Sequence, residues 1–276
     1  MHRGRLPVDP IEIRLPASFG PDHQTAVIDY LADRLIGRAA WAKAFEAFDL
    51  LDQATLATRC QRRTFRALYQ QAIEQGLTDS YLRELLLLGD VERQGPALWA
   101  SYARQIVDEA TRRAWFRADV PETRLLLSYF LYWWGSFARG YALEAMIFRD
   151  LRRSGVSFQA HDVLDRLERY SSCDLTVSGI AGDLKTSVYF VQTGVSLAHD
   201  FYIVRLQLRR RTYTLVVLLQ PLVWERIDGD TMEASLETLD DFLPAPVRIE
   251  HRDHALVVIE YDDWKERILR LQGVER

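Results

Sequence analysis

The chain has 276 residues, 48% hydrophobic and 27% charged, enough to bury one large or two ordinary cores, with no sign of disorder. Its longest apolar run, residues 125–134, is about half the length of a membrane-spanning helix, the N-terminus lacks the apolar core of a secretory signal, and two cysteines provide no disulfide framework. We therefore expect a cytoplasmic protein without membrane contact, and the net charge of -4 counts mildly against tight non-specific binding of nucleic acid.

The charge is unevenly distributed along the chain. Residues 1–120 carry 16 acidic and 16 basic side chains, whereas residues 221–276 carry 14 acidic and 7 basic ones. Only the middle segment, residues 121–220, is basic, with 12 basic against 9 acidic side chains. The overall acidity therefore leaves room for a local basic groove in this segment.

Residues 21–116 space their apolar side chains with helical periodicity, which predicts an all-helical N-terminal region of four to six helices. Breaks are expected at Gly37, Gly76, Gly89 and Gly95-Pro96. The residues around Gly76 also have the spacing of a helix-turn-helix. Four consecutive leucines from Leu85 would then form the recognition helix, and such residues belong in a core, so we favour a plain helical hairpin.

Pro121 is typical of a helix start, and residues 125–153 are predicted to be helical with a bend or break near Gly135 or Gly140. This segment contains an aromatic run, residues 129–134, which could stack nucleic-acid bases. Its continuity with three leucines just before it favours a buried helix instead.

After Gly155 the sequence pattern changes to that of strands. Segments rich in β-branched and aromatic residues predict strands at residues 157–163, 174–177, 180–190, 201–208 and 212–220, then a hairpin of 247–250 with 256–261 and a helix from about residue 262. One helix followed by these strands predicts a mixed α/β domain.

Two aspartates and a lysine lie at the predicted strands 174–177 and 180–190, which would form a hairpin. A two-residue turn at residues 178–179 would place Asp174 opposite Asp183, and alternation would put Lys185 on the same face as Asp183. Only three of the 35 basic residues are lysines, so a lysine here stands out. Facing carboxylates repel one another, and Mg²⁺ is a natural compensating cation because it binds carboxylate oxygens, water and phosphate.

Glu144 adds a third carboxylate from the preceding predicted helix, where it interrupts an otherwise apolar face. A carboxylate in a buried stripe is costly unless it is paired or binds a metal. Taken alone, pairing with Arg139 or another arginine is the simpler explanation. Taken together with Asp174, Asp183 and Lys185, a metal site is favoured.

The order of these residues resembles the PD-(D/E)xK nuclease superfamily, the restriction-endonuclease-like phosphodiesterases. Glu144 on a helix, Asp174 on a strand and Asp183-x-Lys185 on the next strand follow the motif of that superfamily over roughly residues 136–220. Cys173 stands where the name of the motif has proline. The N-terminal region and the acidic C-terminal segment lie outside the resemblance.

The resemblance implies a restriction-endonuclease-like fold, a central mixed sheet flanked by helices, that hydrolyses phosphodiester bonds in nucleic acid, in DNA by the habit of the family. One or two Mg²⁺ ions, with Mn²⁺ as a substitute, would be held by Asp174, Asp183, Glu144 and the backbone carbonyl of Leu184. Lys185 would orient the attacking water or stabilise charge in the transition state, while the metal lowers the pKa of that water. A homodimer would suit an enzyme that cuts both strands.

Other polar residues are weaker candidates. Ser187 and Gln192 could touch a substrate phosphate, but strand-end residues are commonly polar. Arg205 and arginines 209–211 suit a solvated hairpin tip as well as a nucleic-acid backbone. The histidines, which show no metal-binding spacing with the cysteines, are interpreted as structural: His161, His199, His251 and His254.

We therefore predict two parts: a helical region of unassigned role over residues 1–120, and a nuclease-like α/β domain with an acidic C-terminal extension over residues 121–276. The alternative is a module that has the nuclease fold with little or no activity and binds nucleic acid or a protein partner. The net acidity of the chain favours that alternative.

Overall fold

The computed structural model describes residues 11–186, 197–208, 211–219, 232–234, 246–251 and 254–274. The chain divides into two compact units, Met1–Ala138 and Arg139–Arg276. The division falls inside one long helix, α6 (Thr123–Ser154), whereas the sequence placed a boundary at residue 120, before that helix. Within the described residues, no helix combines the length and the apolar character needed to span a membrane.

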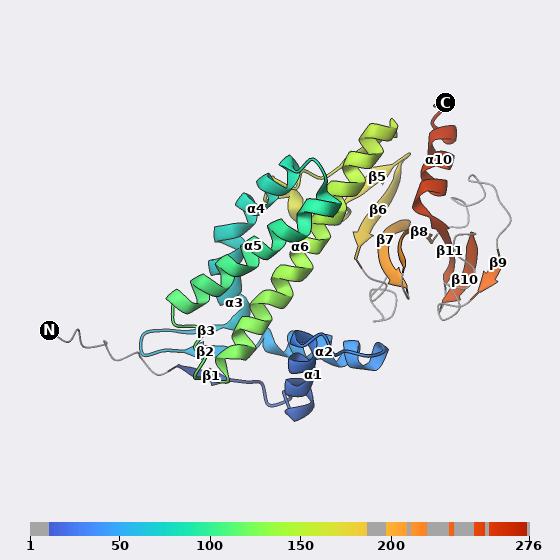
Figure 1. The fold of residues 1–276 in the computed structure, drawn as a ribbon. Coiled ribbons are helices and arrows are strands. Elements are labelled where there is room, and N and C mark those ends of the chain that lie inside the picture. Colours follow the sequence, from blue (N-terminus) through green and yellow to red (C-terminus); the bar gives the residue numbers. More distant parts are fainter. Residues whose placement is uncertain are drawn as a thin grey trace. The chain divides into compact units, whose positions relative to one another are not determined.

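Helices dominate the first unit (Figure 1). They are α1 (Pro21–Leu31), α2 (Arg38–Leu51), α3 (Phe65–Tyr69), α4 (Gln75–Leu87), α5 (Val91–Arg112) and the first half of α6, and a π-helical turn η1 (Gln70–Glu74) joins α3 to α4. The unit also holds a small antiparallel sheet of β1 (Glu12–Arg14), β2 (Thr55–Ala57) and β3 (Arg62–Thr64). The all-helical prediction is therefore not confirmed. The sequence did not reveal these strands because strands of three residues are too short to show an alternating pattern.

Two of the four predicted helix breaks are wrong. Gly37 and Gly89 lie between helices, but Gly76 lies inside α4 and Gly95-Pro96 inside α5. A glycine costs a helix only about 1 kcal/mol, which buried leucines on the same helix can outweigh. Pro96 lies in the second turn of the 22-residue helix α5, where its missing N–H removes one of the many backbone hydrogen bonds of that helix. No turn follows Gly76, so the helix-turn-helix spacing is not realised.

The aromatic run of α6 is buried, as predicted, except that Trp133 is only partly buried. Tyr129, Phe130 and Trp134 are almost fully excluded from solvent. The ring of Tyr132 stacks on Phe48 of α2, with ring centroids 3.9 Å apart. Helix α6 continues through Gly135 and Gly140, so the predicted break does not occur. These aromatic side chains form the core of the first unit and are not available to nucleic-acid bases.

The second unit is built on an eight-stranded mixed sheet, which confirms the mixed α/β prediction (Figure 1). Its strand order is β4-β5-β6-β7-β8-β11-β10-β9, and among the strands in the described residues only the pairs β6·β7 and β9·β10 are parallel. The strands are β4 (Phe158–Ala160), β5 (Leu175–Val177), β6 (Ile180–Lys185), β7 (Phe201–Leu208), β8 (Arg211–Leu218), β9 (Met232–Ala234), β10 (Val247–His251) and β11 (His254–Glu260). The sequence pattern predicted all of them except β9, and the predicted continuation of β6 through residues 187–190 lies outside the described residues.

The two faces of this sheet are both apolar. On one face, Tyr202 and Val204 of β7 belong to a buried cluster that extends over β8, β11 and β10. On the other face, Phe201 packs against Trp264 of helix α10 (Tyr261–Leu271), with ring centroids 5.5 Å apart. Phe148, in the second half of α6, packs against Phe158 of β4 at 5.9 Å. Residues 201–204 of β7 are therefore buried on both faces of the sheet, and β7 pairs with β6 from Gly182–Phe201 to Lys185–Val204.

Gly182 is required where β6 meets β7. It is paired with Phe201, and a Cβ atom at Gly182 would lie 2.2 to 2.6 Å from three carbon atoms of the Phe201 ring. We expect Gly182→Ala to destabilise the protein by about 1–3 kcal/mol, because the ring would have to leave its packing position. Chemical denaturation of Gly182→Ala and Gly140→Ala would test this. A Cβ at Gly140 meets nothing within 4 Å, so an equal loss in both variants would contradict the steric explanation.

Candidate functional site

The hairpin of β5 and β6 brings the two predicted aspartates together. Ser178 and Gly179 both have positive φ angles, 51° and 80°, which identifies the two-residue turn that favours hairpins. Val177 pairs with Ile180 and Leu175 with Gly182. The predicted register is therefore confirmed.

The aspartate side chains meet just beyond the last paired residues. The Asp174 N–H donates to the Gly182 carbonyl (3.0 Å), one residue short of Asp183, and the Asp174 carboxylate accepts from the Leu184 N–H (2.7 Å). Burial, a hydrogen bond with the Asp183 carboxyl, and the charges of Glu144 and Asp183 together raise the pKa of Asp174 to about 8. The two carboxyl groups therefore lie against each other, and a bound cation would offset the repulsion between them.

Lys185 contacts the second of these carboxyl groups. Its Nζ lies 2.5 Å from Oδ2 of Asp183, and its side chain is 38% exposed. Leu184, between them, is buried, as alternation along a strand requires. The ammonium group therefore lies beside the carboxyl pair and partly faces solvent.

Glu144 reaches the same cluster from α6. It lies among the buried residues of that helix, near Ile147 and Phe148, and is only 8% exposed. Its partner is not an arginine: Oε2 of Glu144 lies 2.9 Å from Nε2 of His161. The buried carboxylate is thus compensated by an imidazole.

His161 connects Glu144 to the hairpin. The backbone N–H of His161 donates to the backbone carbonyl of Asp174 (3.2 Å), which extends the pairing of β4 with β5 by one residue. Its Nδ1 lies 3.1 Å from Oγ of Ser171 and 3.7 Å from Oδ1 of Asp174. Burial lowers the pKa of His161, but a hydrogen bond with Glu144 and the nearby carboxylate charges outweigh it and raise the pKa overall.

The sequence interpretation of His161 as structural missed this position. A signal was present, because His161 lies inside the strand predicted at residues 157–163, next to the hairpin, but no local pattern shows which residue of β5 it faces. His199 also lies at the site, with Nε2 at 3.6 Å from Oδ2 of Asp183. His254 is exposed, and the side chain of His251 lies outside the described residues.

The donor set suits a divalent cation. Glu144, His161 and Asp174 each offer a ligand atom, and these atoms lie within 4.8 Å of one another. Asp183 is not in this group, because its Oδ2 is turned to Lys185 and His199. Carboxylates alone suit Mg²⁺, and an added imidazole suits Mn²⁺ and other transition metals. The residues present therefore fit a divalent ion, with Mn²⁺ fitting the three-residue group better than Mg²⁺.

Of the remaining predicted candidates, the structure describes the side chain of Arg205 alone. Ser187, Gln192, Arg209 and Arg210 lie outside the described residues, as does the side chain of Arg211. Arg205 is described, and its Nη1 lies 3.2 Å from the sulfur of Met146 on α6. The structure therefore gives Arg205 a packing partner within its own unit.

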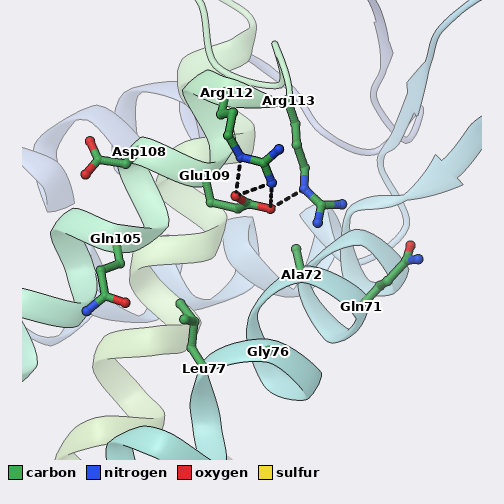
Figure 2. Close-up of a pocket in the computed structure, with 9 residues that line it drawn as sticks. All are labelled: Gln71, Ala72, Gly76, Leu77, Gln105, Asp108, Glu109, Arg112 and Arg113. Atoms are coloured by element: carbon green, nitrogen blue, oxygen red, sulfur yellow. Dashed lines mark hydrogen bonds and ion pairs between the residues drawn. The ribbon is translucent and has the colours of Figure 1, made fainter.

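The first unit holds a separate open pocket of about 450 Å³ between the η1–α4 junction and the end of α5 (Figure 2). Gln71, Gln105 and Asp108 are among its lining residues. Figure 2 shows Glu109 accepting hydrogen bonds from both Arg112 and Arg113. The polar lining of this pocket on α5 is therefore built around ion pairs, and it includes none of the residues of the acidic cluster in the second unit.

Comparisons with protein-family models, with curated proteins and with solved structures found no match to this chain. The functional assignment therefore depends on the site itself.

Proposed function

We propose that this chain is a divalent-metal-dependent nuclease whose second unit has a restriction-endonuclease-like fold. The observation that carries the proposal is the meeting of Asp174 and Asp183 on one hairpin, with Lys185 on Asp183 and the Glu144–His161 pair beside Asp174. This combines the four residues of the motif with an imidazole. The proposed substrate is nucleic acid, with DNA preferred, and the protein would act as a monomer or homodimer.

Each side chain has a definable task in phosphodiester hydrolysis. Glu144, His161 and Asp174 would hold the metal, with Asp183 and the Leu184 carbonyl completing its surroundings. When bound, the metal polarises the phosphoryl oxygen and lowers the pKa of the attacking water. The Lys185 ammonium, which lies beside Asp183, would stabilise the negative charge that develops on the phosphate. Its partial exposure leaves it accessible to a substrate.

The second candidate, a binding module of the same fold, has an observation in its favour. Lys185 and His161 already place positive charge on Asp183 and Glu144 without a metal. A cluster neutralised in this way could persist in a protein that has lost its activity. Such a protein would bind nucleic acid or a protein partner and would not cleave.

A cleavage assay separates the two candidates. The purified protein is incubated with single- and double-stranded DNA and RNA in Mg²⁺, Mn²⁺ or EDTA. We expect cleavage with either metal, none in EDTA, and a rate at least about 100-fold lower for Asp183→Ala, because this change removes a carboxylate from the site and the side chain that Lys185 contacts.

Asp262→Ala is the matched control, because Asp262 also accepts a hydrogen bond from a lysine, Lys265 at 2.9 Å, but lies on α10. It should retain full activity. Cleavage that survives Asp183→Ala would refute the site assignment. Binding of nucleic acid with no cleavage under any condition would establish the second candidate.

A further inference from the structure

A second histidine reaches the candidate site from the turn before β7. Nε2 of His199 lies 3.6 Å from Oδ2 of Asp183, the same oxygen that Lys185 contacts at 2.5 Å. The His199 and Asp183 side chains are both largely buried, at 16% and 13% exposure. Asp183 therefore has two nitrogen-bearing neighbours, a lysine from its own strand and an imidazole from outside it.

Tyr202 holds the His199 turn in place. Its hydroxyl oxygen accepts from the backbone N–H groups of Ala198 (3.0 Å) and His199 (3.3 Å). The phenol and imidazole rings meet edge to face, with centroids 5.5 Å apart. Tyr202 is itself paired with Asp183 across β6 and β7 and is buried in the apolar cluster of that face. The position of the imidazole is thus linked to the core of the sheet.

We propose that His199 is a positioning residue that fixes the carboxylate of Asp183, and that Tyr202 fixes His199. The inference rests on the proposed function, in which Asp183 serves a metal. At 3.6 Å the Nε2–Oδ2 contact is slightly longer than a hydrogen bond, and a small rotation of the imidazole would let an Nε2–H group donate to the carboxylate and restrict its rotation. Hydrogen-bonding partners of this kind around metal ligands are typically worth about 10- to 100-fold in metal affinity or activity.

Each of the two aspartates has its own histidine neighbour. His161 lies against Asp174 and Glu144, whereas His199 lies against Asp183. Lys185 alone cannot fix Asp183 in the presence of substrate if it turns to the phosphate. A second donor that stays on Asp183 would then keep the carboxylate in place during the reaction.

The test compares four variants of the full chain: His199→Ala, His199→Gln, Tyr202→Phe and, as a control, His254→Ala, whose histidine is exposed. kcat and KM are measured with Mn²⁺ on a cleaved substrate, and Mn²⁺ affinity is measured by calorimetric titration. We expect His199→Ala to lower kcat or Mn²⁺ affinity by about 10- to 100-fold with little change in KM for nucleic acid. His199→Gln, which keeps a donor of similar reach, should recover most of the loss, and Tyr202→Phe should show an intermediate loss.

The outcomes are separable. If wild type cleaves and His199→Ala matches His254→Ala, the inference is overturned. A loss that His199→Gln does not recover, together with a lower melting temperature, would also overturn it, because the role of the residue would then be structural. If wild type cleaves no substrate, the proposed function fails, and the Mn²⁺ titration alone tests the positioning role of His199. Weakened Mn²⁺ binding in His199→Ala would support the positioning role, and unchanged binding would overturn it.

Discussion

Replacing Lys185 by alanine is expected to slow metal-dependent cleavage by about 100-fold or more, the usual cost of removing one group that stabilises transition-state charge. The stability of the fold should change little, by about 1 kcal/mol at most, because the Lys185–Asp183 pair is partly exposed to solvent. Initial cleavage rates and urea denaturation of the same preparations would measure both quantities.

Lys43→Ala provides a closely matched control. The Lys43 side chain is 37% exposed, against 38% for Lys185, and it also pairs with one carboxylate, Glu46 at 3.0 Å. Lys43→Ala should cleave like wild type. A similar loss of rate in the two variants would show that Lys185 has no special role. A large loss of stability in Lys185→Ala alone would indicate a structural role instead.

Replacing Asp174 by asparagine is expected to abolish metal-dependent cleavage and, at alkaline pH without metal, to stabilise the protein. The pKa of Asp174 rises from 3.8 to about 8 on folding, through burial and its carboxylate neighbours. Because the folded-state pKa is the higher one, this group contributes stability that is fully present below about pH 4 and lost as the pH rises through about 8. Asparagine remains neutral and avoids that loss.

Thermal unfolding in EDTA between pH 5 and 8.5 tests this expectation. The wild-type melting temperature should fall as the pH rises, and part of that fall should be absent in Asp174→Asn. The raised pKa of His161 lowers the melting temperature in the same pH direction, so Asp174→Asn should still show a smaller fall in melting temperature. Added Mn²⁺ should raise the wild-type melting temperature more at high pH, where ligands are deprotonated, and should have little effect on the variant. Parallel curves for the two proteins would contradict the assignment.

Much of the second unit follows from local sequence. β-Branched and aromatic runs predicted seven of the eight strands of its sheet, and the hydrophobic face of the helix before them predicted that Glu144 is buried. The first unit was less predictable. The glycines inside α4 and α5 do not break those helices, because packing of buried side chains outweighs the weak intrinsic preference of glycine.

The identity of the groups around the carboxylates was not predictable in the same way. The sequence suggested an arginine as the partner of Glu144, and the structure supplies His161. It offered no role for His199, which lies 16 residues beyond Asp183 and reaches it only because β7 runs parallel to β6. Sequence spacing did not identify His161 and His199 as site residues because they reach the carboxylates from separate elements of the fold.

The sequence by itself determined the hairpin that joins Asp174 to Asp183, because a two-residue turn with positive φ at both positions allows one register. It also determined that Lys185 lies on the face of Asp183, since side chains alternate along a strand. Only the tertiary structure decided which residues neutralise these carboxylates. That choice depends on strand order and on where α6 crosses the strands, and both are set by long-range packing that local periodicity does not encode.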